Sequence, residues 1–121
     1  HVKMDRKMGE RHPKYNFIYP VNYGYIPNTI SEDGEEIDVY ILGVFEPVDE
    51  FCGICRAIVY RYDDEENKLI VIPDGKNYTV SQMEVLVEFQ ERFFKHKIFT
   101  PLFACIFNYF ILIIPIVLLN N

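Results

Sequence analysis

The alternation of aliphatic and polar residues predicts a β-strand at residues 36–42. In an extended chain, Ile37, Val39 and Ile41 point to one face. Asp38 and its alternate neighbours point to the opposite face, although aspartate is disfavoured in the interior of a strand. One face of this strand therefore suits a hydrophobic core, and the face that carries Asp38 suits a functional site.

Two further apolar runs and one helical pattern follow. Residues 51–62 and 68–72 are rich in aromatic and β-branched side chains, and the acidic residues 63–67 between them predict a hairpin connection. Large apolar side chains recur at helical spacing over residues 79–94. Strands followed by one long helix predict a small α+β domain, with a β-barrel and a packed helix as the simplest architecture.

The distribution of charge divides the chain. Every Asp, Glu, Lys and Arg lies at or before Lys97, whereas residues 98–121 carry none. We therefore predict a folded domain at residues 1–97 and a separate uncharged hydrophobic tail at residues 98–121. The alternatives for the tail are a membrane anchor, a buried helix and an artefact of gene translation, because its length suits a bilayer span but prolines interrupt it.

Composition limits the classes of function. The 121 residues carry a net charge of −6 and 50% of them are hydrophobic, which supports a packed core. The negative charge disfavours nucleic-acid binding, since that affinity comes from Lys and Arg, and an anionic ligand would need cations to reverse the local field. Three cysteines without a signal peptide predict free thiols in a reducing compartment. The absence of an initiator methionine before His1 suggests an incomplete N-terminus.

Two acidic clusters are candidates for metal binding. Asp33, Glu35 and Asp38 follow one another around a glycine-containing turn, and residues 63–66 form the second cluster. Crowded carboxylates repel one another unless they are solvated or share a multivalent cation, and Mg²⁺ prefers oxygen ligands. Solvated turns and a metal site with two walls both account for these clusters when they are considered alone.

A tyrosine-rich segment at residues 17–29 precedes the first cluster and predicts a rigid aromatic loop. The motifs NYGY, DGEEID and DDEENK thus follow one another along the chain. This ordered set resembles the soluble family I inorganic pyrophosphatases over about residues 2–94. The resemblance implies an OB-like five-stranded β-barrel with a C-terminal helix, followed here by the apolar tail. It also implies Mg²⁺ ions at the barrel mouth and an inorganic diphosphatase that hydrolyses pyrophosphate to two phosphates.

The resemblance also implies roles for individual residues. Glu35 stands where the family has an aspartate that accepts the proton of the attacking water. Asp64 is the alternative to Asp63 as a metal ligand, because the hairpin that carries both looks shorter than the commoner family version. The family's C-terminal Tyr-Lys contact with phosphate has no counterpart after Phe94. The implied roles are catalysis by Glu35 and Asp38, metal binding by Asp33, Asp38, Asp63 and Glu66, and substrate binding by Tyr23, Lys68 and Arg6.

We therefore expect a cytoplasmic pyrophosphatase in which a Mg²⁺-activated water attacks pyrophosphate within a carboxylate-lined site. A homo-oligomer is expected and a nucleic-acid partner is not. A membrane is expected as a partner only through residues 98–121, which would anchor the domain to the cytoplasmic face. The alternatives are a non-catalytic metal- or phosphate-binding module, or an inactive fragment of such an enzyme. An OB-type nucleic-acid binder is a further alternative, which the acidic strand disfavours.

Overall fold

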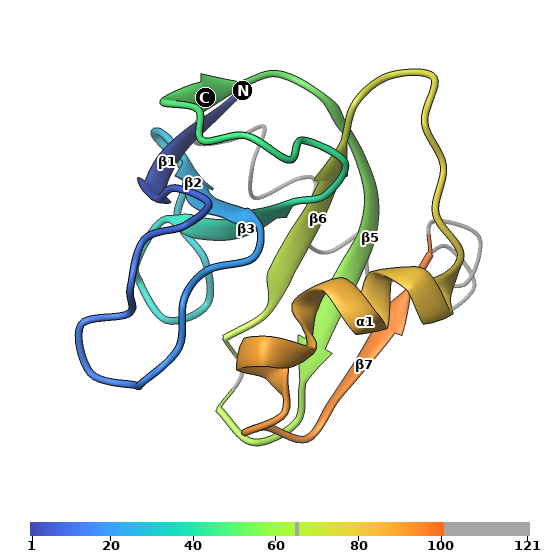
Figure 1. Cartoon of the computed structure of the whole chain (residues 1–121). Coiled ribbons are helices and arrows are strands. Elements are labelled where there is room, and N and C mark those ends of the chain that lie inside the picture. The colour runs from blue at the N-terminus through green and yellow to red at the C-terminus, as the bar shows by residue number, and fades with distance from the viewer. Residues whose placement is uncertain (65, 101–121) are drawn as a thin grey trace.

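The computed structural model describes residues 1–64 and 66–100 of the chain (Figure 1). These residues form a single seven-stranded sheet and one helix that packs against it. The order of the strands across the sheet is β4-β1-β2-β3-β6-β5-β7. The elements along the chain are β1 (Val2–Arg6), β2 (Asn22–Ile26), β3 (Ile37–Ile41), β4 (Glu50–Phe51), β5 (Ile54–Arg61), β6 (Lys68–Ile72), α1 (Val80–Glu91) and β7 (His96–Phe99).

The sheet consists of two antiparallel halves that one parallel pair joins. Strands β1, β2 and β3 pair antiparallel, and so do β6, β5 and β7. Strands β3 and β6 pair in parallel, with Asp38 opposite Lys68. Figure 1 shows the two halves beside each other, with α1 in front of β5 and β7. The junction of the halves therefore brings an acidic and a basic residue together.

Both faces of the central strands are buried. One cluster of core residues includes Tyr40 of β3 together with Met83 and Val87 of α1. The second cluster lies on the other face and includes Val2 from β1 and Phe99 from β7. These two residues come from strands near opposite ends of the sheet, so their shared cluster requires the sheet to curve strongly.

Strand β3 follows the predicted alternation only in part. Ile37, Val39 and Ile41 all belong to the second core cluster, as the pattern predicts. On the opposite face, Tyr40 is fully buried because α1 covers it, whereas 35% of the Asp38 side chain remains exposed. The face of β3 that was predicted to carry a site is therefore part of the hydrophobic core, and it reaches solvent at Asp38.

The predicted α+β architecture is confirmed at the level of a mostly-sheet fold with one helix among the described residues. The five-stranded barrel is not confirmed, since the sheet has seven strands and no pairing between the described parts of β4 and β7 closes it. The helix is not the last element, because β7 follows it and pairs with β5. Ile98 and Phe99 are buried, so the strand crosses the predicted boundary at residue 97.

The tyrosine-rich segment contains strand β2, where the sequence predicted a loop. Gly24 explains why this strand pairs so closely with β1. A Cβ atom at Gly24 would lie 2.0 Å from the carbonyl oxygen of Lys3, so any side chain there would push the two strands apart. The glycine of the NYGY motif thus permits the pairing of β1 with β2, which the tyrosine-rich sequence did not indicate.

Helix α1 brings a charged residue into the interior. It begins with a capping box, in which Thr79 Oγ1 accepts a hydrogen bond from the Gln82 N–H at 3.1 Å and Gln82 Oε1 accepts one from the Thr79 N–H at 2.8 Å. Met83, Val87 and Glu91 then follow at intervals of four and are all buried. The last member of this apolar stripe is a carboxylate.

Glu91 is fully buried and pairs with Arg61 of β5. Arg61 Nη2 and Nε lie 2.6 and 3.0 Å from the two carboxylate oxygens. The Tyr40 hydroxyl donates to the same carboxylate at 2.7 Å, and the Gln90 amide donates to that hydroxyl at 2.7 Å. The Arg61 guanidinium also lies 3.8 Å from the centre of the Phe94 ring. This network connects α1 to β3 and β5.

No helix within residues 1–64 and 66–100 is long and apolar enough to cross a membrane. From residue 101 onward, the predicted tail lies outside the described residues.

We predict that Glu91→Gln lowers the free energy of unfolding by about 3–5 kcal/mol, because it removes the fully buried carboxylate that binds the Arg61 guanidinium and leaves that cation with the more exposed Asp64 and Glu66. Urea denaturation followed by circular dichroism measures this change. The matched control is Glu88→Gln on the same helix, where an exposed ion pair with Arg92 is lost and the expected cost is about 0.5 kcal/mol. Equal losses in the two variants would contradict the prediction.

Candidate active site

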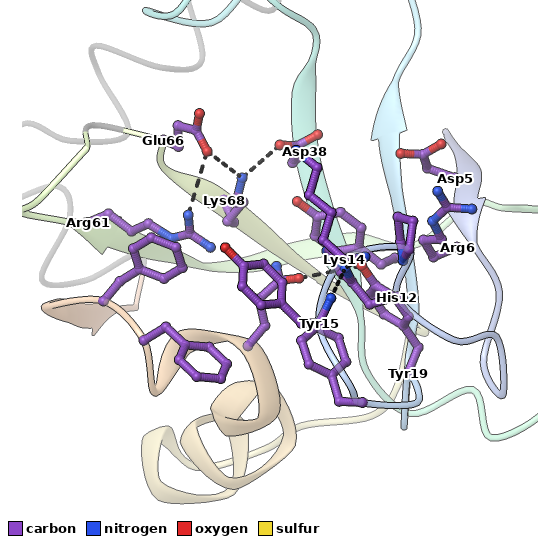
Figure 2. A pocket seen from close by; sticks show the side chains of 16 residues that line it. Asp5, Arg6, His12, Lys14, Tyr15, Tyr19, Asp38, Arg61, Glu66 and Lys68 are labelled. Carbon is purple, nitrogen blue, oxygen red and sulfur yellow. Dashed lines mark hydrogen bonds and ion pairs between the residues drawn. The ribbon is translucent and has the colours of Figure 1, made fainter.

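A cleft of about 560 Å³ opens where several elements converge (Figure 2). Its polar floor contains Tyr23 from β2, Asp38 from β3, Arg61 from β5 and Lys68 from β6. The loop at residues 7–18 forms one wall, and the C-terminal end of α1 with the residues that follow it forms another. Strands from both halves of the sheet therefore contribute to a single site.

Lys68 lies between two carboxylates of the cleft. Its Nζ atom is 2.7 Å from Asp38 Oδ2 and 3.8 Å from Glu66 Oε2. The Lys68 side chain is only 3% exposed, whereas the Glu66 side chain is 46% exposed. The parallel register of β3 and β6 places Asp38 and Lys68 on adjacent positions of the same face. The ammonium is thus buried while its two partners reach solvent.

Arg61 is a second buried cation of the cleft. Its Nη1 atom lies 3.1 Å from Asp64 Oδ2 and 3.6 Å from Glu66 Oε2. Glu91 binds the other edge of the same guanidinium, which fixes its orientation. Glu66 therefore faces both buried cations, Arg61 and Lys68.

Two tyrosines of the cleft remain neutral hydrogen-bond donors. Burial raises the pKa of Tyr23 well above its ordinary value, and the nearby Asp38 carboxylate raises it further. Burial also raises the pKa of Tyr19 to about 12. A phenol that keeps its proton at neutral pH can donate to an anionic oxygen, so Tyr23 has the protonation state that a phosphate contact requires.

The structure gathers part of the site expected from the sequence. Asp38 and Glu66 come from separate acidic clusters and meet at Lys68 (Figure 2). The expected residues that line the cleft are Arg6, Tyr23, Asp38, Glu66 and Lys68.

Three expected residues lie outside the lining of the cleft. Asp33 accepts hydrogen bonds from the Ser31 hydroxyl and from the Glu35 N–H, and these bonds lower the pKa of Asp33, with a smaller contribution from Lys68. Glu35 is exposed on the same turn. Asp63 accepts a 2.7 Å hydrogen bond from the Lys95 N–H, so it joins the hairpin to the segment before β7. Asp33 therefore stabilises its own turn, whereas Asp63 connects the hairpin to the segment before β7.

Several residues in or beside the cleft were not expected from the sequence. Asp5 precedes the expected Arg6 on β1 and lines the same cleft. Arg61 is a charged residue within an apolar strand, which is the pattern that drew attention to Asp38. Glu91 is likewise a charged residue on the apolar stripe of α1. Lys14 belongs to a basic loop for which the sequence leaves both a solvated position and a position facing phosphate open, and in the structure it lines the cleft.

The oxygen donors of the cleft fit a hard divalent cation. No group of three or more His, Cys, Asp or Glu side chains within the described residues is close enough to hold a metal ion. Asp38, Glu66 and Asp5 nevertheless line one cleft. Mg²⁺ commonly keeps several waters and binds through one or two carboxylates together with substrate phosphates, so it suits this donor set better than a metal that needs a complete protein cage.

Solved structures with a similar fold are inorganic pyrophosphatases. The enzyme from Ehrlichia chaffeensis matches with a TM-score of 0.64 and 19% identity, over 85% of this chain and 86% of that chain. The enzyme from Thermus thermophilus matches with a TM-score of 0.55 and 14% identity, over 81% of this chain and 78% of that chain. At these identities the similarity defines the class of fold, a curved sheet with a packed helix.

Sequence comparison gives the family. The inorganic pyrophosphatase of Saccharolobus solfataricus is 37% identical over 79 residues, which cover 62% of this chain and 43% of that protein. The one from Campylobacter jejuni is 32% identical over 114 residues, which cover 83% of this chain and 63% of that protein. A sequence model of the inorganic pyrophosphatase family matches residues 2–100, so the chain belongs to this family. It spans about half the length of the curated relatives it matches.

Two histidines have opposite electrostatic surroundings. Burial lowers the pKa of His12, and the positive charges of Arg6 and Lys14 lower it further. Burial also opposes protonation of His96, but hydrogen bonds with the Phe94 carbonyl and with Glu84 outweigh it and leave the pKa raised. His12 is therefore the more acidic imidazole.

We predict that His12 loses its proton below pH 6.5 and His96 above it, as measured by NMR titration with His12→Asn for assignment. The contribution of neutral His12 to stability is then complete above pH 6.5 and declines as the pH falls through its folded-state pKa. The contribution of protonated His96 is complete below pH 6.5 and is lost as the pH rises through its folded-state pKa. The reverse order of titration would contradict these surroundings.

Proposed function

We propose that the chain hydrolyses inorganic pyrophosphate to two phosphates in this cleft, with Mg²⁺ as the cofactor. The observation that carries the proposal is the meeting of Asp38 and Glu66 at Lys68, in a chain that belongs to the inorganic pyrophosphatase family. Membership of that family supports pyrophosphate as the substrate. Because the chain spans about half the length of its curated relatives, their activity is a proposal for this chain.

The proposed division of labour follows the charges of the cleft. Asp38 and Glu66 would hold Mg²⁺, together with Asp33 and one carboxylate of the hairpin, Asp63 or Asp64. When bound, Mg²⁺ supplies neutralisation of the diphosphate charge and acidity for a water molecule. Among the hairpin carboxylates, Asp64 has the better position, since it contacts Arg61 of the cleft whereas Asp63 contacts the Lys95 N–H.

The cations and phenols of the cleft would bind the substrate. In this proposal, Lys68 and Arg6 neutralise phosphate oxygens, and Tyr23 donates its hydroxyl proton in a hydrogen bond. Asp38 and Glu35 are the proposed catalytic carboxylates, of which Asp38 lines the cleft and Glu35 lies on the turn before β3. The position of Glu35 supports a smaller contribution to catalysis than that of Asp38.

We also propose three wider features of this protein: the extent of its folded domain, its location and its oligomeric state. The folded domain extends to about residue 100, because β7 is part of the sheet and the family match ends there. A cytoplasmic location is supported by the free thiols of Cys52 and Cys55. A homo-oligomer is supported by an apolar groove beside α1, where Phe45 and Val85 are 57% and 74% exposed.

We predict that the full chain releases phosphate from pyrophosphate when Mg²⁺ is present and not when it is chelated. Asp38→Asn should lower kcat at least about 100-fold, since it removes a carboxylate from the centre of the site. Glu35→Gln should cost less than Asp38→Asn. Phosphate release measured by a colorimetric assay gives these values, and Glu32→Gln, an exposed position on the same turn, is the matched control with unchanged activity.

Two results would contradict the proposal. Activity of Asp38→Asn equal to that of the unmodified chain would remove Asp38 from the mechanism. Binding of Mg²⁺ and phosphate without release of phosphate from pyrophosphate would instead support the non-catalytic module. Circular dichroism of each variant separates a lost function from a lost fold.

A further inference from the structure

The cations that line the cleft fall into two groups. Lys68 and Arg61 are buried and each pairs with carboxylates. Arg6 and Lys14 line the same cleft, but neither forms an ion pair with any of the described residues. An anion that enters the cleft therefore meets two cations that form no ion pair with the described residues.

Lys14 is exposed, yet the backbone that carries it is held in place. His12 Nδ1 accepts hydrogen bonds from the N–H of Lys14 at 2.9 Å and from the N–H of Tyr15 at 3.1 Å. Because this nitrogen accepts, it carries no proton, and the imidazole is neutral. Its ring also packs against Tyr15, Phe17 and Tyr19, with centroids 4.8, 4.9 and 6.0 Å apart. The loop is therefore built around His12.

The positive charges of Arg6 and Lys14 both act on His12. Arg6 and Lys14 both lower the pKa of His12, after the larger effect of burial. Figure 2 shows His12 and Lys14 on the loop and Arg6 on β1, around the same side of the cleft. Asp5 also lines the cleft, but among the described residues it forms no ion pair with either cation. The carboxylates that would hold a metal face Lys68 and Arg61 instead.

We propose that Lys14 is a further substrate-binding residue, which contacts phosphate oxygens together with Arg6, and that His12 positions it. This inference rests on the proposed function, since it names the residues that hold the phosphate group in that same cleft. The cleft then has one end where carboxylates hold a cation and one wall where unpaired cations hold phosphate. A dianionic phosphate would supply the partner that Arg6 and Lys14 lack.

Equilibrium binding of inorganic phosphate in the presence of Mg²⁺, measured by calorimetry on the full chain, tests the role of Lys14. Lys14→Gln should raise Kd about tenfold, as expected for loss of a charge-assisted hydrogen bond at an exposed position, and Lys14→Arg should keep the affinity within about twofold. Arg11→Gln is the matched control, because it removes the same charge from the same loop at a residue that contacts Asn16 and does not line the cleft. A similar Kd for Lys14→Gln and for the unmodified chain would overturn the inference.

The positioning role of His12 has a separate test. His12→Ala removes the acceptor of both N–H groups and should raise Kd for phosphate about as much as Lys14→Gln does. His12→Asn places an amide oxygen near the position of Nδ1 and can accept from the backbone two residues on, so it should restore most of the affinity. Loss of affinity in both variants, or in neither, would overturn the role of His12 as the residue that orients Lys14.

Activity distinguishes failure of this inference from failure of the proposed function. If the unmodified chain releases no phosphate from pyrophosphate but binds phosphate through Lys14, the hydrolase proposal fails and the role of Lys14 stands. If the chain is active, KM for pyrophosphate should rise about tenfold in Lys14→Gln while kcat changes less. An active chain whose KM and Kd are both insensitive to Lys14→Gln would retain the hydrolase proposal and overturn this one. Absence of any phosphate binding would overturn it as well.

Discussion

The pairing of Asp38 with Lys68 is the contact on which the site depends. It lies where the two antiparallel halves of the sheet meet, because β3 and β6 run parallel with these residues opposite each other. The ammonium is buried, so a carboxylate beside it offsets much of the cost of removing the charge from water. Glu66 approaches the same ammonium from the hairpin, and one buried cation thereby gathers two acidic segments that are far apart in sequence.

A second buried charge pair extends this arrangement to the helix. Glu91 ends the buried stripe of α1 and binds Arg61, whose other edge faces Asp64 and Glu66. The helix is therefore anchored by the same guanidinium that forms part of the cleft floor. An unpaired buried charge is costly, so these side chains have little freedom to rearrange independently. Such rigidity suits a site that must bind a small, highly charged anion in one orientation.

Much of the architecture followed from local patterns. The alternation around Asp38 predicted β3, and the acidic hairpin and the helix after it also lie where their patterns indicated. Two of the strands that were missed, β2 and β7, have physical explanations. β2 is rich in tyrosine and depends on Gly24 for its close approach to β1, and β7 is a short edge strand whose apolar residues resembled the start of the tail. These segments form strands because they pair with segments distant in sequence. A local pattern carries no information about such pairing.

The sequence by itself determined the kinds of chemical group available: crowded carboxylates, a lysine and an arginine at the ends of apolar runs, and tyrosines near a glycine. It also carried enough similarity to indicate the family that the match over residues 2–100 establishes. Only the tertiary structure decided which groups share a cleft. Asp38 and Glu66 meet there, whereas Asp33 stabilises a turn and Asp63 binds the Lys95 N–H. The loop around His12 brings Lys14 to a wall of the same cleft. The reason is that hydrogen bonds and burial act over a few ångströms in space, whatever the separation along the chain.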